Sequence, residues 1–310
     1  HLPSGIEVKE APSDFLRFML VSIFLAVNTC RQRRFDLAVG GSGLVAPTLL
    51  LLKILFGQST AVLVHGLDIV IDNYVYQKLF VPCIRRMDCV IANSNNTRKL
   101  AMEKGVLDEK IDIVNPGTTL PEEKSEQSIM GFRSDKNITF QKYLVFVGRM
   151  TKRKGLSAFL QNCMPLILNA SPDTGLVVVG DEPQNSLNKL GEQSEIMSTI
   201  SALGLEEHGL FLGQISDQDL ELCYAGAAVQ IFPLIEVPGD VEGFGMVAIE
   251  AAACGTPTVA FDLGGVADAI SSTNGRPITP NDYQAFGQTV VNVIASGQPN
   301  AASCRNHAHM

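Results

Sequence analysis

Short runs of aliphatic and β-branched residues alternate along the whole chain with longer stretches of helical periodicity. In the first part of the chain these runs predict strands at residues 36–39, 61–64, 89–92 and 111–114. In the second part they predict strands at residues 143–147, 176–179, 209–212, 229–232 and 257–261. Because strands that alternate with helices are typical of parallel sheets, the pattern predicts an α/β fold with two doubly wound parallel sheets.

A polar and irregular stretch separates the two sets of strands. It follows Pro116 and Gly117 and is richest in charge at residues 121–126 and 133–136. A chain of 310 residues is long enough for two domains of ordinary size. We therefore expect an N-terminal domain over residues 1–125 and a C-terminal domain over residues 126–310.

The composition fits a packed globular protein, since 46% of the residues are hydrophobic and 18% are charged. Residues 1–117 carry 13 Lys and Arg against 11 Asp and Glu, a net charge of +2, and the remainder carries 11 against 21, a net charge of −10. A nucleic-acid-binding protein would have a dominant basic face, so this class is excluded. The seven cysteines are scattered without Cys-x-x-Cys spacing, which indicates free thiols in a reducing cytoplasm.

Two arginine clusters lie near apolar helical stretches, Arg31, Arg33 and Arg34 in one and Arg85 and Arg86 in the other. Such clusters fit either solvated helix ends or contact with anionic lipid headgroups. The apolar stretch at residues 15–27 is too short to span a bilayer. We expect a cytoplasmic protein, and peripheral contact with the inner face of the membrane stays open.

The segment from Glu242 to Glu250 contains the clearest candidate site. Gly243 and Gly245 permit a tight turn, and a helix is expected from Met246 to Cys254. Free backbone N–H groups and the helix dipole at such a helix start favour an anion. A carboxylate beside a phosphate site suits the recognition of sugar hydroxyls, because like charges repel.

A second candidate motif follows the strand at residues 143–147. The strand runs into Gly148 and Arg149, and Lys154 comes where the next helix is expected to begin. Cations at this position favour a negatively charged ligand. The motif precedes Glu242 by about 90 residues.

In this order and at this spacing the two motifs resemble those of retaining glycosyltransferases with the GT-B fold, of the family 4 type (glycosyl transferases group 1). The resemblance covers most of residues 143–270. It implies two Rossmann-like domains that face each other across a cleft. The family normally opens with a strand, a glycine-rich loop and a long helix before the position matched by residue 36, so we expect an incomplete N-terminal domain.

The resemblance also implies roles for individual residues. Arg149 and Lys154 would hold the donor diphosphate, Glu242 the sugar hydroxyls and Glu250 the ribose. His65, which follows the strand at residues 61–64, would contact the transferred sugar from across the cleft. The expected catalytic residues are therefore His65, Arg149, Lys154 and Glu242. The expected donor-binding residues are Gly148, Gly243, Phe244, Gly245, Met246, Val247 and Glu250.

No metal and no cofactor beyond the donor is expected. Asp217 and Asp219, the one Asp-x-Asp pair, follow Ser216 and read as the acidic first turn of a helix. The predicted function is a metal-independent, retaining hexosyltransferase that moves a sugar from a nucleoside diphosphate sugar to a glycan or lipid-linked acceptor, in polysaccharide or glycolipid synthesis. Two alternatives remain open, a catalytically weak or inactive nucleotide-sugar-binding fragment and a GT-B nucleotide-sugar epimerase.

Overall fold

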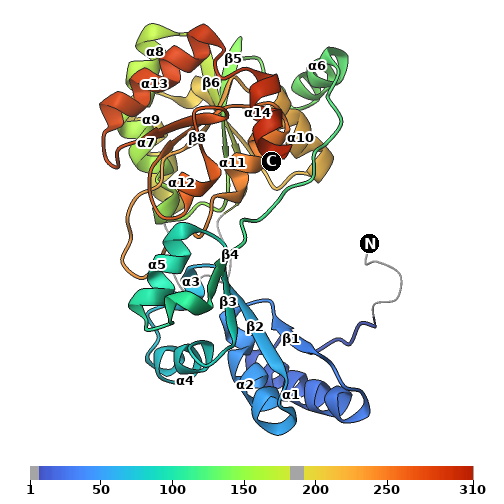
Figure 1. Ribbon diagram of the computed structural model, residues 1–310. Helices are drawn as coiled ribbons and strands as arrows, with labels where there is room; N and C mark the ends of the chain where they lie inside the picture. The colour runs from blue at the N-terminus through green and yellow to red at the C-terminus, as the bar shows by residue number, and fades with distance from the viewer. Residues whose placement is uncertain (1–6, 182–191, 310) are drawn as a thin grey trace. The chain divides into compact units, whose positions relative to one another are not determined.

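The computed structural model describes residues 7–181 and 192–309. The chain divides into two compact units, His1–Asn115 and Pro116–Met310, and the ribbon in Figure 1 follows both. The division falls after Asn115, whereas the domain boundary expected from the sequence lies after residue 125. Among the described residues no helix is both long and apolar enough to cross a membrane.

The first unit contains one parallel sheet with the strand order β1-β2-β3-β4. Its elements are α1 (Phe15–Gln32), β1 (Leu37–Gly40), η1 (Gly43–Val45), α2 (Ala46–Phe56), β2 (Ser59–Val64), α3 (Leu67–Val70), α4 (Tyr74–Ile84), β3 (Cys89–Ala92), α5 (Asn95–Glu103), η2 (Asp108–Lys110) and β4 (Ile111–Ile113). Every strand runs in the same direction, so the amino ends of all four strands gather at one end of the unit.

Alternate residues of these strands build the core of the first unit. Val62 and Val64 of β2 pack with Val90 of β3 and with Leu49 of α2. Ser94 caps α5 through its side chain, which accepts a hydrogen bond from the Thr97 amide.

The second unit contains a larger parallel sheet with the strand order β10-β9-β8-β5-β6-β7. Its elements are α6 (Glu126–Asp135), β5 (Lys142–Val147), η3 (Lys152–Lys154), α7 (Leu156–Asn162), α8 (Met164–Ala170), β6 (Thr174–Val179), α9 (Glu192–Leu203), η4 (Glu206–His208), β7 (Gly209–Gly213), α10 (Asp217–Ala225), β8 (Val229–Phe232), α11 (Met246–Ala253), β9 (Thr258–Phe261), α12 (Val266–Ala269), β10 (Gly275–Ile278), α13 (Tyr283–Ser296) and α14 (Ala301–His309).

The central strands of this sheet are covered on both faces. Helices α7, α9 and α13 pack on one face around Phe159 and Phe286, and α10 and α11 pack on the other with Tyr224. Figure 1 shows α7, α9 and α13 together on one side of the sheet. The strand order reverses at β5, between β8 and β6, and ligands of doubly wound folds bind at the carboxyl ends of strands at such a point.

The nine predicted strands are all present, with ends that differ by a few residues. Strand β10 was not predicted, because Gly275–Ile278 contains a glycine, an arginine and a proline. The prediction of irregular structure near residues 121–136 was wrong in part. Helix α6 begins after Ser125, whose side chain caps it, and it buries Phe132 against the second sheet.

Candidate functional site

The two sequence motifs meet at the carboxyl ends of β5 and β8. Lys154 ends η3, which follows β5, and its Nζ lies 2.8 Å from Oε2 of Glu242 in the loop between β8 and α11. Lys154 is only 8% exposed, and Nζ also lies 4.6 Å from the centre of the Phe232 ring. Burial beside a carboxylate and an aromatic face holds this ammonium group in one place.

Gly155 explains why a glycine follows Lys154. Its φ angle is +69°, and a Cβ at this position would lie 1.9 Å from the carbonyl oxygen of Pro233. No other residue permits this close approach of the two backbones. The Ile235 amide donates a hydrogen bond to the Arg153 carbonyl oxygen at 2.9 Å, so η3 is held against the segment that follows β8.

Arg153 adds a second cation to the site. Its Nε lies 2.9 Å from Oδ1 of Asp240, and its Nη1 contacts the same Glu242 oxygen that Lys154 contacts. The side chains of Arg153 and Asp240 are 9% and 12% exposed. Two cations and two carboxylates thus form a buried network with no net charge, which we call the charge network.

The charge network sets the ionisation of its members. Burial raises the pKa of Glu242, but the charges of Lys154 and Arg153 outweigh that effect, and the pKa lies below its ordinary value. Burial lowers the pKa of Lys154, and Glu242 opposes that effect. Arg149 is exposed, and its positive charge contributes to the lowered pKa of Lys154.

The loop before α11 leaves the backbone at the helix start without a side-chain cap. Gly245 precedes the helix with a φ angle of +99°. A Cβ on Gly265 would lie 2.0 Å from the Gly243 carbonyl oxygen, and the Gly265 amide donates to the Glu242 carbonyl at 2.9 Å. The Phe244 side chain is buried in a hydrophobic cluster, so only its backbone can face a ligand.

Glu250 lies on α11 and faces a pocket outside the charge network. It lines a pocket of about 290 Å³ together with Asp217, Leu220 and Tyr224 of α10. Burial raises the pKa of Glu250, and the charge of Lys154 opposes that effect. Glu250, the residue expected to hold the ribose, therefore shares a pocket with α10.

His65 belongs to the first unit, where it follows β2 and is exposed. Its Nε2 lies 2.9 Å from the Gly41 carbonyl oxygen. The carboxylate of Asp68 accepts bonds from the His65 amide at 2.7 Å and the Gly43 amide at 3.0 Å. Asp68 thus joins the loops after β1 and β2.

The sequence analysis assigned roles to Arg149, Lys154, Glu242 and Glu250 but none to Arg153 or Asp240. Arg153 was part of the basic run and Asp240 lies two residues before Glu242. Arg153 and Lys154 carry two positive charges, and Asp240 and Glu242 carry two negative charges. This opposite charge of two short segments was the signal that could have identified Arg153 and Asp240. Among residues 7–181 and 192–309, no three His, Cys, Asp or Glu side chains gather as metal ligands would.

Comparison with known proteins identifies relatives of the second unit. The sequence profile of the family "Glycosyl transferases group 1" matches residues 141–296. The D-inositol 3-phosphate glycosyltransferase of Segniliparus rotundus is 33% identical over 186 residues, which are 57% of this chain and 38% of that protein. A GDP-mannose-dependent monoacylated alpha-(1-6)-phosphatidylinositol monomannoside mannosyltransferase of Corynebacterium glutamicum is 26% identical over 188 residues, 59% of this chain and 45% of that protein. The matches thus span less than half the length of these two relatives.

Solved structures match both units. Anabaena Alr3699/HepE in complex with UDP superposes with a TM-score of 0.77 and 21% identity, over 93% of this chain and 76% of that one. Sucrose-phosphate synthase from Thermosynechococcus elongatus gives a TM-score of 0.72 and 21% identity, over 98% of this chain and 75% of that one. At this level of identity the likeness establishes the fold.

Proposed function

Since the chain belongs to the glycosyl transferases group 1 family and has the GT-B fold, we propose that it transfers a sugar from a nucleoside diphosphate sugar to an acceptor hydroxyl, with retention of configuration and without a metal ion. One observation carries the proposal. Lys154 and Glu242 are in contact at the carboxyl ends of β5 and β8, directly before a helix start without a side-chain cap.

The chemistry of sugar transfer explains why this arrangement is useful. The departing nucleoside diphosphate gains negative charge as the glycosidic bond breaks. Arg149, Lys154 and the amides at the start of α11 are the groups that would stabilise that charge. Fixed protein cations take the part that a divalent ion has in other transferases, which is the basis for proposing a metal-independent reaction.

The carboxylates have separate roles in this proposal. Glu242 would accept hydrogen bonds from sugar hydroxyls once the diphosphate competes for Lys154. Glu250 would bind the ribose at the mouth of the pocket that it shares with α10. The spacing of Glu242 and Glu250 is that of retaining members of the family, which supports retention. His65 is the proposed sugar contact from the first unit.

The relatives support a donor and acceptor class. The structural neighbours from Anabaena hold UDP or UDP-glucose, which favours a nucleoside diphosphate sugar donor. The relative from Segniliparus is named for an inositol phosphate, and the relative from Corynebacterium is named for a phosphatidylinositol mannoside. We therefore propose an acceptor in glycolipid or polysaccharide synthesis.

Ligand-dependent thermal unfolding tests the donor site. UDP, GDP, ADP and CMP are added separately, each free and as a sugar conjugate. A ligand at 100 times its Kd stabilises the folded protein by about 2.7 kcal/mol. If the nucleotides of one base stabilise the protein, that base identifies the donor class. If none of the nucleotides or nucleotide sugars stabilises it, the proposal is contradicted.

Product analysis then separates the proposed reaction from its alternatives. Glycosylated acceptor with the anomeric configuration of the donor, formed equally well after treatment with EDTA, is the expected product. Conversion of the nucleotide sugar into its epimer without acceptor would identify an epimerase. Binding without either product would identify a nucleotide-sugar-binding chain.

A further inference from the structure

Glu242 uses only one of its two carboxylate oxygens within the charge network. Oε2 contacts Nζ of Lys154 and Nη1 of Arg153, whereas Oε1 accepts no hydrogen bond in the described part of the chain. We propose that Arg153, itself fixed by Asp240, is a positioning residue that keeps Glu242 directed at the hydroxyls of the donor sugar when the diphosphate binds Lys154. The inference rests on the proposed function, because it requires a nucleoside diphosphate sugar at this site.

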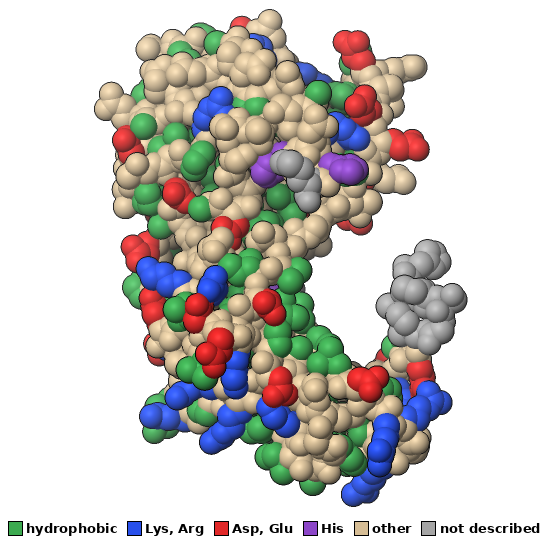
Figure 2. All heavy atoms as spheres, viewed as in Figure 1, with side chains coloured by type: hydrophobic (Ala, Val, Ile, Leu, Met, Phe, Trp, Pro, Cys, Tyr) green, Lys and Arg blue, Asp and Glu red, His purple; other side chains and the backbone are tan. Residues whose placement is uncertain are grey.

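The charge network lies unusually far from water for a group of charged side chains. Charged side chains usually stay at the surface, and Figure 2 shows them spread over the visible face of the molecule. The four side chains of the charge network, by contrast, are only 9% to 16% exposed. A buried charge that loses its partner is left without compensation. Glu242 therefore needs a cation beside it both before and after a ligand binds.

Lys154 cannot remain that cation once the donor is bound. In the proposed function its ammonium group contacts the diphosphate, so its contact of 2.8 Å with Glu242 has to be given up or shared. Arg153 does not face this competition in the same way. Its Nε is already bonded to Asp240 at 2.9 Å while its Nη1 contacts Glu242. The planar guanidinium fork thus engages two carboxylates at once, which a single ammonium group does less well.

The backbones that carry the two side chains are also fixed. The Gly265 amide donates to the Glu242 carbonyl at 2.9 Å, and a Cβ on Gly264 would lie 2.4 Å from the same carbonyl oxygen. The Ile235 amide holds the Arg153 carbonyl in turn. With both backbones held, the direction of the Glu242 carboxylate depends on the cations that contact it.

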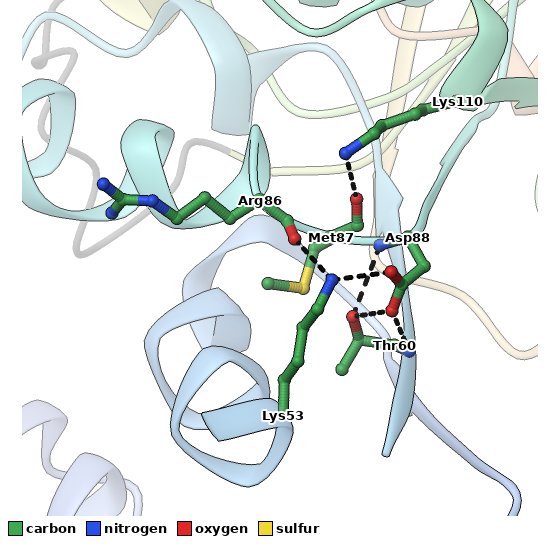
Figure 3. A network of polar contacts seen from close by, with 6 residues as sticks. All are labelled: Lys53, Thr60, Arg86, Met87, Asp88 and Lys110. Carbon is green, nitrogen blue, oxygen red and sulfur yellow. Dashed lines mark hydrogen bonds and ion pairs between the residues drawn. The ribbon is translucent and has the colours of Figure 1, made fainter. Parts of the chain in front are cut away.

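An ion pair of the first unit shows how a carboxylate with a purely structural role differs. Nζ of Lys53 donates to Oδ1 of Asp88 at 2.6 Å, and Oδ2 of Asp88 accepts bonds from the amide and the hydroxyl of Thr60, as Figure 3 shows. Both oxygens of Asp88 are thus used within the protein. In Glu242 two cations share one oxygen, which leaves the other for a ligand.

Calorimetry on the whole chain tests the proposal, with the nucleoside diphosphate selected by thermal unfolding and with its sugar conjugate. Arg153→Lys keeps the positive charge but loses the fork. We expect a nearly unchanged Kd for the nucleoside diphosphate and a Kd for the nucleotide sugar that rises about 10- to 100-fold, the worth of one charged hydrogen bond. Glu242→Gln should have the same selective effect.

A double-mutant cycle shows whether Arg153 acts through Glu242. Arg153→Lys should cause no further loss of nucleotide-sugar affinity in a chain that already carries Glu242→Gln. Lys152→Gln, an exposed change on the same short helix, and Lys53→Gln, which breaks the ion pair of Figure 3, should leave both Kd values unchanged. Melting temperatures check that each variant is folded.

The outcomes separate this inference from the proposed function. If Arg153→Lys weakens the binding of both ligands equally, leaves both unchanged, or has an effect that adds to that of Glu242→Gln, the positioning role of Arg153 is overturned and the proposed function stands. If the native chain binds neither ligand, the proposed function is contradicted and the positioning role with it.

Discussion

Arg153 donates through Nε to Oδ1 of Asp240 at 2.9 Å, although 87 residues separate the two in the sequence. The same guanidinium contacts Glu242 through Nη1. One side chain at the end of β5 therefore fixes two carboxylates of the loop after β8. The position of Glu242 depends on Arg153 as well as on Lys154.

Replacing Arg153 should destabilise the second unit. Arg153→Met leaves two buried carboxylates with one cation, and breaking a buried ion pair in this way costs about 3–5 kcal/mol. Urea unfolding measures the loss. Lys136→Met is the control, because Lys136 pairs with Asp219 at a more exposed site, where solvent screens the pair, and its replacement should cost much less. Equal losses in the two variants would contradict a structural role for the charge network.

Removing either proposed donor-site cation should reduce turnover, and for Arg149, which is exposed, stability should hardly change. For Arg149→Met or Lys154→Met we expect kcat/KM to fall about 100-fold or more, since each group would stabilise charge on the leaving diphosphate. Steady-state kinetics with the donor found by thermal unfolding measures the effect. Lys152→Gln on the same short helix is the matched control and should retain near-normal kcat/KM.

Glu250→Gln should separate ligand binding from stability. The variant would lose the proposed charged hydrogen bonds to the ribose, each worth about 1.5–3 kcal/mol, so nucleotide Kd should rise about 10- to 100-fold. Burial raises the pKa of Glu250, so an uncharged side chain fits its surroundings better and the ligand-free melting temperature should not fall. Calorimetry gives both values. Glu236→Gln, in the exposed part of the β8–α11 loop, should leave nucleotide affinity unchanged.

Acidification should release the stability that Glu242 supplies. Its pKa is lower in the folded chain than in the unfolded chain, so its contribution is present above the unfolded value of about 4.3 and is lost as the pH falls through the folded value. The free energy of unfolding should therefore decrease below about pH 4.3 more steeply in the native chain than in Glu242→Gln. Glu207→Gln, an exposed control, should keep the native slope.

His65 and Asp68 should behave differently when replaced. Asp68→Ala removes the acceptor of two amide bonds and should destabilise the first unit by about 1–3 kcal/mol. His65→Phe should leave the melting temperature nearly unchanged and reduce kcat. A His65→Phe variant with normal kcat would contradict the proposed contact of His65 with the transferred sugar.

Sequence patterns predicted the parts of this protein that follow from local periodicity. Buried strands such as the one predicted at residues 143–147 are recognisable because both of their faces are apolar. Helix α6 was missed because it has one buried aromatic residue, Phe132, and too few apolar residues for a helical pattern. Phe132 is buried only because the helix packs against the second sheet.

In the candidate site, too, some residues lie in local sequence motifs and others are brought together only by the fold. Glu242, Glu250, Arg149 and Lys154 lie in motifs that can be read along the chain. The pairing of Arg153 with Asp240 is set by the order of strands in the sheet, which places the ends of β5 and β8 side by side. No local pattern specifies that neighbourhood.

The four strands of the first unit run in the same direction, so the two ends of its sheet carry different residues. Strand β2 has six residues, and at a rise of about 3.3 Å per residue its two ends stand about 20 Å apart. His65 follows the carboxyl end of β2, so a ligand that contacts His65 meets the first unit at the end of the sheet opposite the amino ends of its strands.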